Sequence, residues 1–129
     1  MNPPTESTAL APEQEAQLRE ALKRCSPATI EAARQFWQTG RTAYLPVIVT
    51  GVLERFVEPA RRARLRADED AARLVEDLAL DSLTMMEIVM LTEEVLRITI
   101  DNEDLRRLQT VGDVKKFVLC KVRSAPGGS

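Results

Sequence analysis

The feature that most constrains the fold is the spacing of the apolar residues, which follows a helical period along most of the chain. Proline or glycine marks many of the breaks between these segments, and no stretch shows the sustained period-two alternation of a strand. One clear apolar face comprises Ile30, Ala33, Phe36 and Trp37. The pattern predicts an all-α bundle.

The composition divides the chain into four parts. Residues 1–12 and 124–129 are rich in Pro, Gly, Ser and Thr, which predicts flexible ends. Residues 13–43 are expected to form a helical N-terminal extension, and residues 44–123 the main domain.

Start and stop signals place the individual helices. Ser26-Pro27 is an N-cap followed by proline at the first helical position, and Gly40 is placed to end that helix. Thr110 and Asp113 have the spacing of a capping box. The expected helices are Glu13–Arg24, Ser26–Thr39, Leu45–Val57, Leu83–Leu96, Asp101–Leu108 and one that opens at Thr110.

A long polar connection with an arginine run, Arg61 to Arg66, is expected from Ala60 to about Ala72. The run is either a solvated loop or frayed helix end, or a docking patch for an acidic partner. After it, Leu74, Val75 and Leu78 form a short apolar anchor.

The distribution of charge bears on the partners. The net charge is only −2, but nine acidic residues and one basic residue lie between Glu76 and Asp104. An acidic block repels phosphate backbones and attracts basic proteins, so we expect no nucleic acid partner. The chain has no histidine, which removes the commonest general base and metal ligand, and we expect neither catalysis nor a metal site.

Other features concern the compartment. No window is long and apolar enough to cross a bilayer, and the N-terminus lacks the pattern of a secretory signal. Cys25 and Cys120 lie far apart without metal-type spacing, which favours two thiols over a disulfide. We expect a cytoplasmic protein that does not associate with membranes.

The candidate site lies where the Leu83–Leu96 helix begins. The Asp81 carboxylate can accept backbone N–H bonds of the first turn, and Ser82 falls in that turn with its side chain pointing outward. A phosphodiester on Ser82 would lie beside unpaired N–H groups and the positive end of the helix dipole. Taken alone, Asp-Ser-Leu is a weak signal, because both polar residues could simply cap the helix.

The residues that follow carry a family resemblance. The segment from Leu74 to Val118 resembles the acyl carrier proteins of bacterial fatty acid and polyketide synthesis, in the family's order and without a gap. The matching motifs are Asp77-Leu78, Asp81-Ser82-Leu83, Glu87-Ile88-Val89-Met90, Glu93-Glu94, Ile98-Thr99-Ile100, Glu103 and Thr110-Val111-Gly112-Asp113.

This resemblance implies a small four-helix acyl-carrier-type bundle, here with the additional N-terminal extension. It implies that Ser82, between Asp81 and Leu83, is where a phosphopantetheinyl transferase attaches 4'-phosphopantetheine. Acyl intermediates would be held on that arm as thioesters and delivered to a ketosynthase, acyltransferase, reductase or dehydratase. The chain would be a monomeric carrier without enzymatic activity.

The Leu83–Leu96 helix has two faces that differ in character. Ile88, Val89, Thr92, Val95 and Leu96 are expected to face the core. Nearer the other side, a methionine pair bordered by carboxylates predicts a docking surface for basic proteins. Its residues are Met86, Glu87, Met90, Glu93 and Glu94. The alternatives are that the methionines only widen the core face, and that the glutamates are an ordinary solvated face.

Two other interpretations of the whole chain remain open. One is a carrier of aminoacyl or aryl groups for peptide synthesis. The other is an unmodified helical adaptor that binds partners through the Met-acidic helix. The chain also departs from the resembled family, which often has glycine where Ala79 stands and lacks the N-terminal extension. These departures indicate a dedicated pathway or a specialised synthase.

Overall fold

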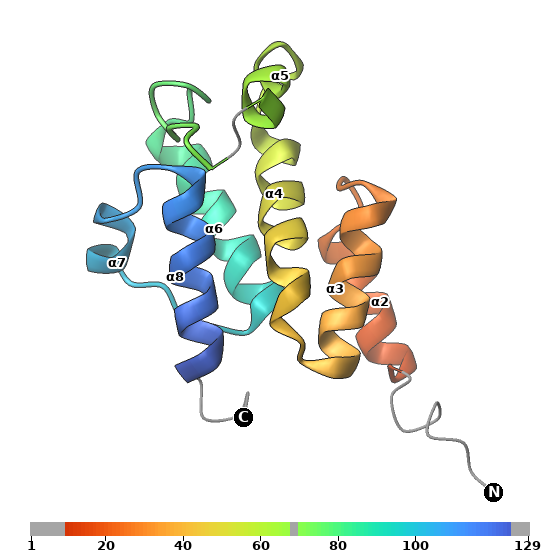
Figure 1. The fold of residues 1–129 in the computed structure, drawn as a ribbon. Helices are drawn as coiled ribbons and strands as arrows, with labels where there is room; N and C mark the ends of the chain where they lie inside the picture. The colour runs from red at the N-terminus through yellow and green to blue at the C-terminus, as the bar shows by residue number, and fades with distance from the viewer. Residues whose placement is uncertain (1–9, 68–69, 125–129) are drawn as a thin grey trace, which may run out of the picture.

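The computed structural model describes residues 10–67 and 70–124, and within them it is helical, with one isolated bridge between Arg73 and Thr110. The all-α prediction is confirmed. Figure 1 shows α2 and α3 on one side of α4, with α7 and α8 on the other. The elements are α2 (Pro12–Ala21), α3 (Pro27–Thr39), the 3-10 helix η1 (Thr42–Tyr44), α4 (Leu45–Phe56), α5 (Pro59–Ala67), α6 (Ser82–Leu96), α7 (Asn102–Arg106) and α8 (Val111–Ser124).

Helix α4 is the centre of the bundle and packs against α3, α6 and α8. Its side chains Ile48, Val52 and Leu53 are at most 2% exposed. Burying a Val, Leu or Ile side chain contributes about 1.5–3 kcal/mol to folding, so this helix supplies much of the hydrophobic stabilisation. The same core includes Leu18 and Leu22, which lie in and directly after α2.

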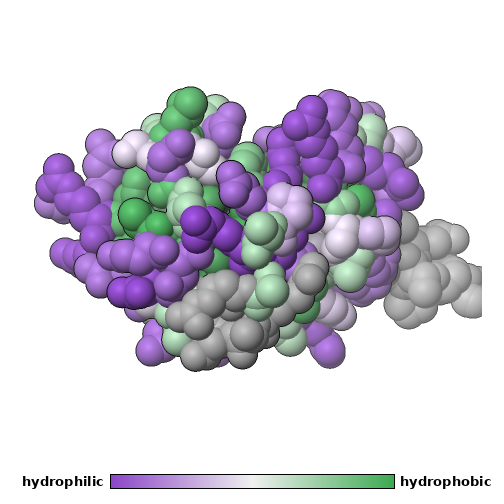
Figure 2. Space-filling view, turned by 90° about the horizontal axis from the view of Figure 1, so that it is seen from above, coloured by the Kyte–Doolittle hydropathy of each residue, from purple (hydrophilic) through white to green (hydrophobic). Residues whose placement is uncertain are grey.

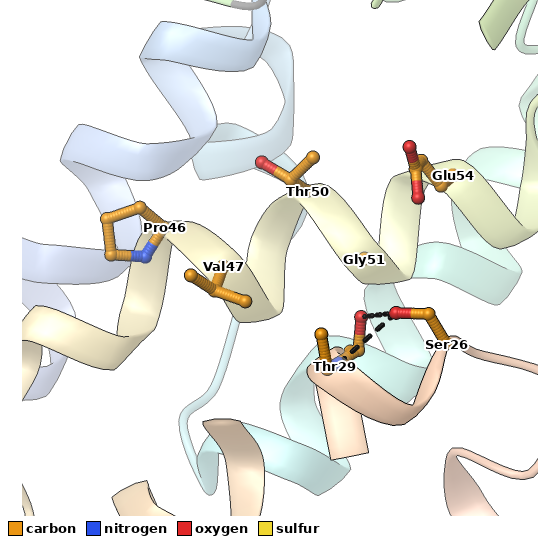
Figure 3. Close-up of a pocket in the computed structure, with 8 residues that line it drawn as sticks. Ser26, Thr29, Pro46, Val47, Thr50, Gly51 and Glu54 are labelled. Atoms are coloured by element: carbon orange, nitrogen blue, oxygen red, sulfur yellow. Dashed lines mark hydrogen bonds between the residues drawn. The ribbon is translucent and has the colours of Figure 1, made fainter. Parts of the chain in front are cut away.

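Gly51 of α4 lies next to Thr29, in the first turn of α3 (Figure 3). A Cβ atom at Gly51 would lie 1.9 Å from Thr29 Oγ1 of α3, far inside van der Waals contact. Thr29 is 2% exposed, and its hydroxyl lies 2.9 Å from Ser26 Oγ, so it has little freedom to move. Gly51 is therefore required for the packing of the two helices.

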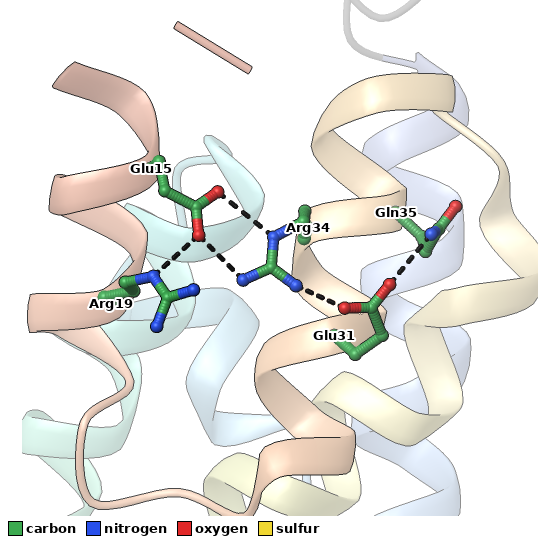
Figure 4. Close-up of polar contacts among 5 residues, drawn as sticks. All are labelled: Glu15, Arg19, Glu31, Arg34 and Gln35. Carbon is green, nitrogen blue, oxygen red and sulfur yellow. Dashed lines mark hydrogen bonds and ion pairs between the residues drawn. The ribbon is translucent and has the colours of Figure 1, made fainter. Parts of the chain in front are cut away.

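An ion cluster joins α2 to α3 (Figure 4). The Glu15 carboxylate accepts hydrogen bonds from Arg34 Nη2 and Arg19 Nε, both at 2.7 Å, and Arg34 also pairs with Glu31. The hydrogen bonds from Arg34 and Arg19 lower the pKa of the Glu15 carboxyl from its ordinary value of 4.5 to about 2. The extension is thus held together by charge as well as by apolar contact.

Trp37 of α3 secures the end of α6. Its indole Nε1 donates a 2.7 Å hydrogen bond to the Val95 carbonyl, which belongs to the last turn of α6. Carbonyls of a last turn lack intrahelical donors, so the indole satisfies one of them. The Arg97 guanidinium stacks on the Trp37 ring 4.2 Å from its centroid, and Arg97 ends α6 in a left-handed conformation, with φ of 59°.

The expectation of a polar connection from Ala60 to about Ala72 is corrected by the structure, in which Pro59–Ala67 form helix α5. Pro59 stands at its first position, and Leu65 is fully buried, so the segment folds as a helix anchored on the core. Arg62 Nε donates to the carbonyls of Glu54 and Val57, both at 3.1 Å, and thereby caps the end of α4. The side chains of Arg64 and Arg66 lie outside the described residues.

The other expected helices are found within a few residues of their expected bounds. Ser26 accepts the N–H of Thr29 at 3.2 Å, and Gly40 ends α3 in a left-handed conformation, as its position predicts. Thr110 and Asp113 form the expected reciprocal capping box at the start of α8. Of the predicted flexible ends at 1–12 and 124–129, residues 1–9 and 125–129 lie outside the described residues, whereas Pro12 and Ser124 belong to α2 and α8.

Two further features concern cysteine and the membrane. Cys25 and Cys120 are free thiols, as expected. Within the part of the chain that the structure describes, no helix has the length and apolar character needed to span a membrane.

Candidate functional site at the start of helix α6

The turn before α6 is fixed by three buried leucines and one carboxylate. Leu74, Leu78 and Leu80 are at most 3% exposed, and Asp77 accepts the N–H of Arg73 at 2.8 Å. Val75 does not belong to this anchor, because it is 63% exposed, so that part of the prediction is wrong. The leucines pack into the core of the bundle, and the residues that follow them lie at the surface.

Asp81 and Ser82 occupy the helix start that the sequence predicts. Asp81 is the N-cap of α6, and its Oδ1 accepts the Thr84 N–H at 2.8 Å. This hydrogen bond lowers the pKa of the Asp81 carboxyl, so the group is ionised at neutral pH. Ser82 is the first residue of α6 and is exposed, and Leu83 beside it is 73% exposed. Ser82 therefore lies at the surface of the bundle.

A pocket of about 460 Å³ adjoins Ser82. Viewed from the end of the bundle where α6 begins, hydrophobic side chains are visible among hydrophilic ones, on the side of α7 (Figure 2). Leu105 and Leu108, in and after α7, form part of the wall, and sequence reasoning did not place them at the site. The lining residues are Leu74, Val75, Leu80, Asp81, Ser82, Met85, Met86, Leu105 and Leu108.

Helix α6 has the two faces expected of it. The predicted inner residues Ile88, Val89, Thr92, Val95 and Leu96 are all buried. Met86 and Met90 are 48% and 64% exposed, so the alternative in which they widen the core face is wrong. The half-buried Met85 packs against the core instead. The two exposed methionines place flexible apolar side chains at the surface.

The carboxylates beside these methionines differ in their surroundings. Glu87 and Glu94 are exposed along α6. Glu93 is half-buried, and its Oε2 accepts the N–H of Ile100 at 2.8 Å, which ties the segment after α6 to the helix. Glu93 therefore has a structural contact, while Glu87 and Glu94 face solvent.

Comparison with known proteins identifies the class of this site. A family model described as a phosphopantetheine attachment site matches residues 60–118, which contain the turn, Ser82 and all of α6. The exposed hydroxyl, the adjoining first-turn N–H groups and the open surface fit a covalently held phosphodiester. Residues 60–118, the carrier segment, are thus similar to a family of segments whose cofactor is covalent 4'-phosphopantetheine.

Two curated proteins are similar to part of this chain. The acyl carrier protein of Wolinella succinogenes is 40% identical over 50 residues, covering 39% of this chain and 66% of that protein. The acyl carrier protein of an Exiguobacterium species is 47% identical over 47 residues, covering 36% of this chain and 60% of that protein. Over this segment, the chain is similar to acyl carrier proteins.

The matched stretches span less than two thirds of these relatives' length. No solved structure matches the chain significantly. Helices α2 and α3 lie outside the residues that the family model matches.

Proposed function

We propose that the protein is an acyl carrier whose Ser82 hydroxyl bears the 4'-phosphopantetheine arm. One observation carries this proposal: Ser82 is exposed at the first position of α6, next to the N-capping Asp81, inside the segment that matches the phosphopantetheine attachment family. A phosphopantetheinyl transferase would direct Ser82 Oγ onto the pyrophosphate of coenzyme A: a phosphodiester bond to the arm forms, the P–O bond inside the pyrophosphate breaks, adenosine 3',5'-bisphosphate leaves, and the transferase takes the serine proton. Acyl groups would then be held on the terminal thiol as thioesters.

The pocket beside Ser82 favours an acyl cargo over an aminoacyl or aryl one. Its wall is largely aliphatic or thioether in character, with leucines from the turn before α6 and from α7. Thioether and leucine side chains adapt to a flexible aliphatic chain, whereas none of the described residues that line the pocket is aromatic and could stack on an aryl group. We propose that this pocket shields an acyl chain from water between enzyme visits.

The exposed face of α6 supports delivery to several partners. Leu83, Met86 and Met90 offer apolar contacts, and Glu87 and Glu94 attract basic surfaces. The proposed partners are the transferase and the acyl-handling enzymes of fatty acid, polyketide or related lipid synthesis, namely a ketosynthase, acyltransferase, reductase or dehydratase. We expect a monomer that acts in the cytoplasm.

The decisive experiment measures the intact mass of the full chain after incubation with coenzyme A and a broad-specificity phosphopantetheinyl transferase. The mass should increase by one arm, and Ser82→Ala should abolish the increase. Ser26→Ala is a matched control, since Ser26 is also an exposed serine at a helix start, but lies outside the matched segment. It should leave the increase intact.

An unchanged mass for the unaltered chain would contradict the carrier proposal and favour the unmodified adaptor. An increase that survives in Ser82→Ala and is lost in Ser26→Ala would place the arm on the wrong serine. Circular dichroism of each variant shows whether it is folded.

A further inference from the structure

The N-terminal extension and the carrier segment share a groove. It has a volume of about 410 Å³ and is bounded by α2, α4 and α6. Its lining residues are Glu20, Ala21 and Lys23 on the α2 side, Arg55 and Phe56 of α4, and Glu87, Met90, Leu91 and Glu94 of α6. Helix α2 packs directly on α6, so the groove belongs to the folded bundle.

The groove has an apolar floor. Met90 is 64% exposed, Phe56 is half-buried, and Leu91 is 8% exposed beneath them. Exposed thioethers and aromatic rings in a concave site are typical of protein-binding surfaces. The floor has room for an apolar side chain from another molecule.

The rim of the groove carries opposite charges on its two sides. The α6 side has Glu87 and Glu94, which are exposed. The α2 and α4 side has Lys23, whose side chain is 59% exposed, and Arg55, which stacks on Phe56 at 4.7 Å. Glu20 pairs with Lys23 at 2.8 Å and moderates the positive side, although this pair is solvent-exposed and weak.

We propose that this groove is a docking site for a partner-protein helix with charges of both signs. An apolar side chain of that helix enters beside Met90, a basic residue faces Glu87 and Glu94, and an acidic residue faces Lys23 and Arg55. Lys23 and Arg55 repel a partner with a wholly basic surface and lower its affinity. The residues on the α2 and α4 side of the groove therefore make binding more selective. This inference rests on the proposed function, because a carrier must be visited by other proteins.

The position of the groove makes such a contact compatible with access to Ser82. Met90 lies eight residues after Ser82 along α6, a rise of about 12 Å. A standard interface covers about 800 Å² of each partner, a patch roughly 30 Å across. A protein that receives the arm of Ser82 can therefore also contact α2.

The test uses two labelled synthetic helical peptides with the same leucine stripe. One has lysines along one edge of the stripe and glutamates along the other, and the second has lysines along both edges. Binding to the full chain is measured by fluorescence anisotropy at low and high salt. We expect the two-signed peptide to bind about 3- to 10-fold more tightly at low salt, although the net charge of −2 favours the all-basic one.

The variants assign this preference to the groove. Lys23→Glu should shift it toward the all-basic peptide, whereas Lys116→Glu, the same charge change on an exposed residue of α8, should leave it unchanged. Met90→Ala should weaken the binding of both peptides. Equal effects of Lys23→Glu and Lys116→Glu, a preference for the all-basic peptide, or no binding of either peptide would overturn the proposal.

Loading of Ser82 does not enter this measurement, so the two proposals can fail separately. If the chain gains the arm but shows no peptide preference, the carrier proposal is supported and the groove proposal is contradicted. If the chain shows the preference but does not gain the arm, the groove proposal is supported and the carrier proposal is contradicted.

Discussion

The N-terminal extension and the carrier segment are held together by different kinds of polar contact. In the extension, polar side chains bridge separate helices: Glu15 to Arg34, and Trp37 to the Val95 carbonyl. In the carrier segment, aspartates bond backbone N–H groups at most four residues away, and only Glu93 among the carboxylates of the described hydrogen bonds to backbone reaches further, to the Ile100 N–H. The aspartate pairs are Asp77 with Arg73, Asp81 with Thr84, Asp101 with Asp104, and Asp113 with Gln109 and Thr110.

The difference shows which polar contacts form only after the helices have packed together. A carboxylate that caps its own helix acts as soon as that helix forms, whereas Glu15 and Trp37 act only once distant elements have met. Substitutions at the contacts between helices should therefore loosen the extension, and substitutions in the capped turns should have local effects.

The largest effect is expected where α3 meets α4. Gly51→Ala places a methyl group against the buried Thr29 and should lower the free energy of unfolding by about 2 kcal/mol, because overpacking outweighs the gain in helix propensity. Urea unfolding followed by circular dichroism measures this change. Gly40→Ala is the control: its site is open, and the left-handed φ of 72° should cost only about 1 kcal/mol. A neutral Gly51→Ala would mean that α3 is not seated this closely on α4.

The next effect separates the extension from the end of α6. Trp37→Phe removes the hydrogen bond to the Val95 carbonyl and should destabilise the fold by about 1–2 kcal/mol. Arg97→Ala removes the stacked cation but keeps that hydrogen bond, so it should cost less, about 0.5–1 kcal/mol. Urea unfolding by circular dichroism compares the two variants. If Arg97→Ala were the more damaging, stacking rather than the indole bond would attach α3 to α6.

The Glu15–Arg34 pair should make the extension sensitive to acid. Because folding lowers the pKa of Glu15 to about 2, its contribution is complete above the ordinary value of 4.5 and is lost as the pH falls from 4.5 toward 2. The two side chains retain 29% and 21% exposure, so solvent screens the pair and the contribution is about 1 kcal/mol.

Unfolding of the native chain and of Glu15→Gln at pH 7 and at low pH tests this expectation. The difference in unfolding free energy between the two proteins should be present at pH 7 and should shrink on acidification. Glu20→Gln, which alters the exposed pair with Lys23, is the control and should show a smaller difference at pH 7. A Glu15→Gln difference that stays constant with pH would show that the carboxylate is not the origin of the effect.

The contrast between contacts within one turn and contacts between distant helices explains what the sequence could predict. The starts of α3, α6 and α8 were predictable because Ser26, Asp81 and the Thr110–Asp113 pair bond N–H groups of their own first turns. The exposure of Ser82 was predictable for a similar reason, because Ser82 lies in the first turn of α6. Local chemistry was sufficient in each of these cases.

Features that depend on distant contacts were not predictable. Helix α5 is stabilised by the burial of Leu65 and by the bonds from Arg62 to the end of α4, neither of which a local pattern reveals. The wall that Leu105 and Leu108 contribute beside Ser82 required the position of α7. Glu93 has the pattern of a surface acid, yet it bonds Ile100 seven residues further on.

The smallest expected effect concerns strain in the turn before Ser82. Ala79 has a φ of 58°, a left-handed conformation that glycine adopts without steric cost and that the resembled family often fills with glycine. Ala79→Gly should relieve this strain, but the more flexible unfolded chain offsets part of the gain, which leaves a net stabilisation of about 0.5 kcal/mol. Urea unfolding measures it.

A second alanine in the same region provides the control. Ala71 is exposed and does not have a positive φ, so Ala71→Gly should destabilise the fold by about 0.5 kcal/mol through the unfolded chain alone. Opposite signs for the two changes would show that the turn stores strain at Ala79, three residues before Ser82. If both changes destabilise the protein equally, Ala79 does not hold the left-handed conformation in solution, and the turn presents Ser82 through its buried leucines alone.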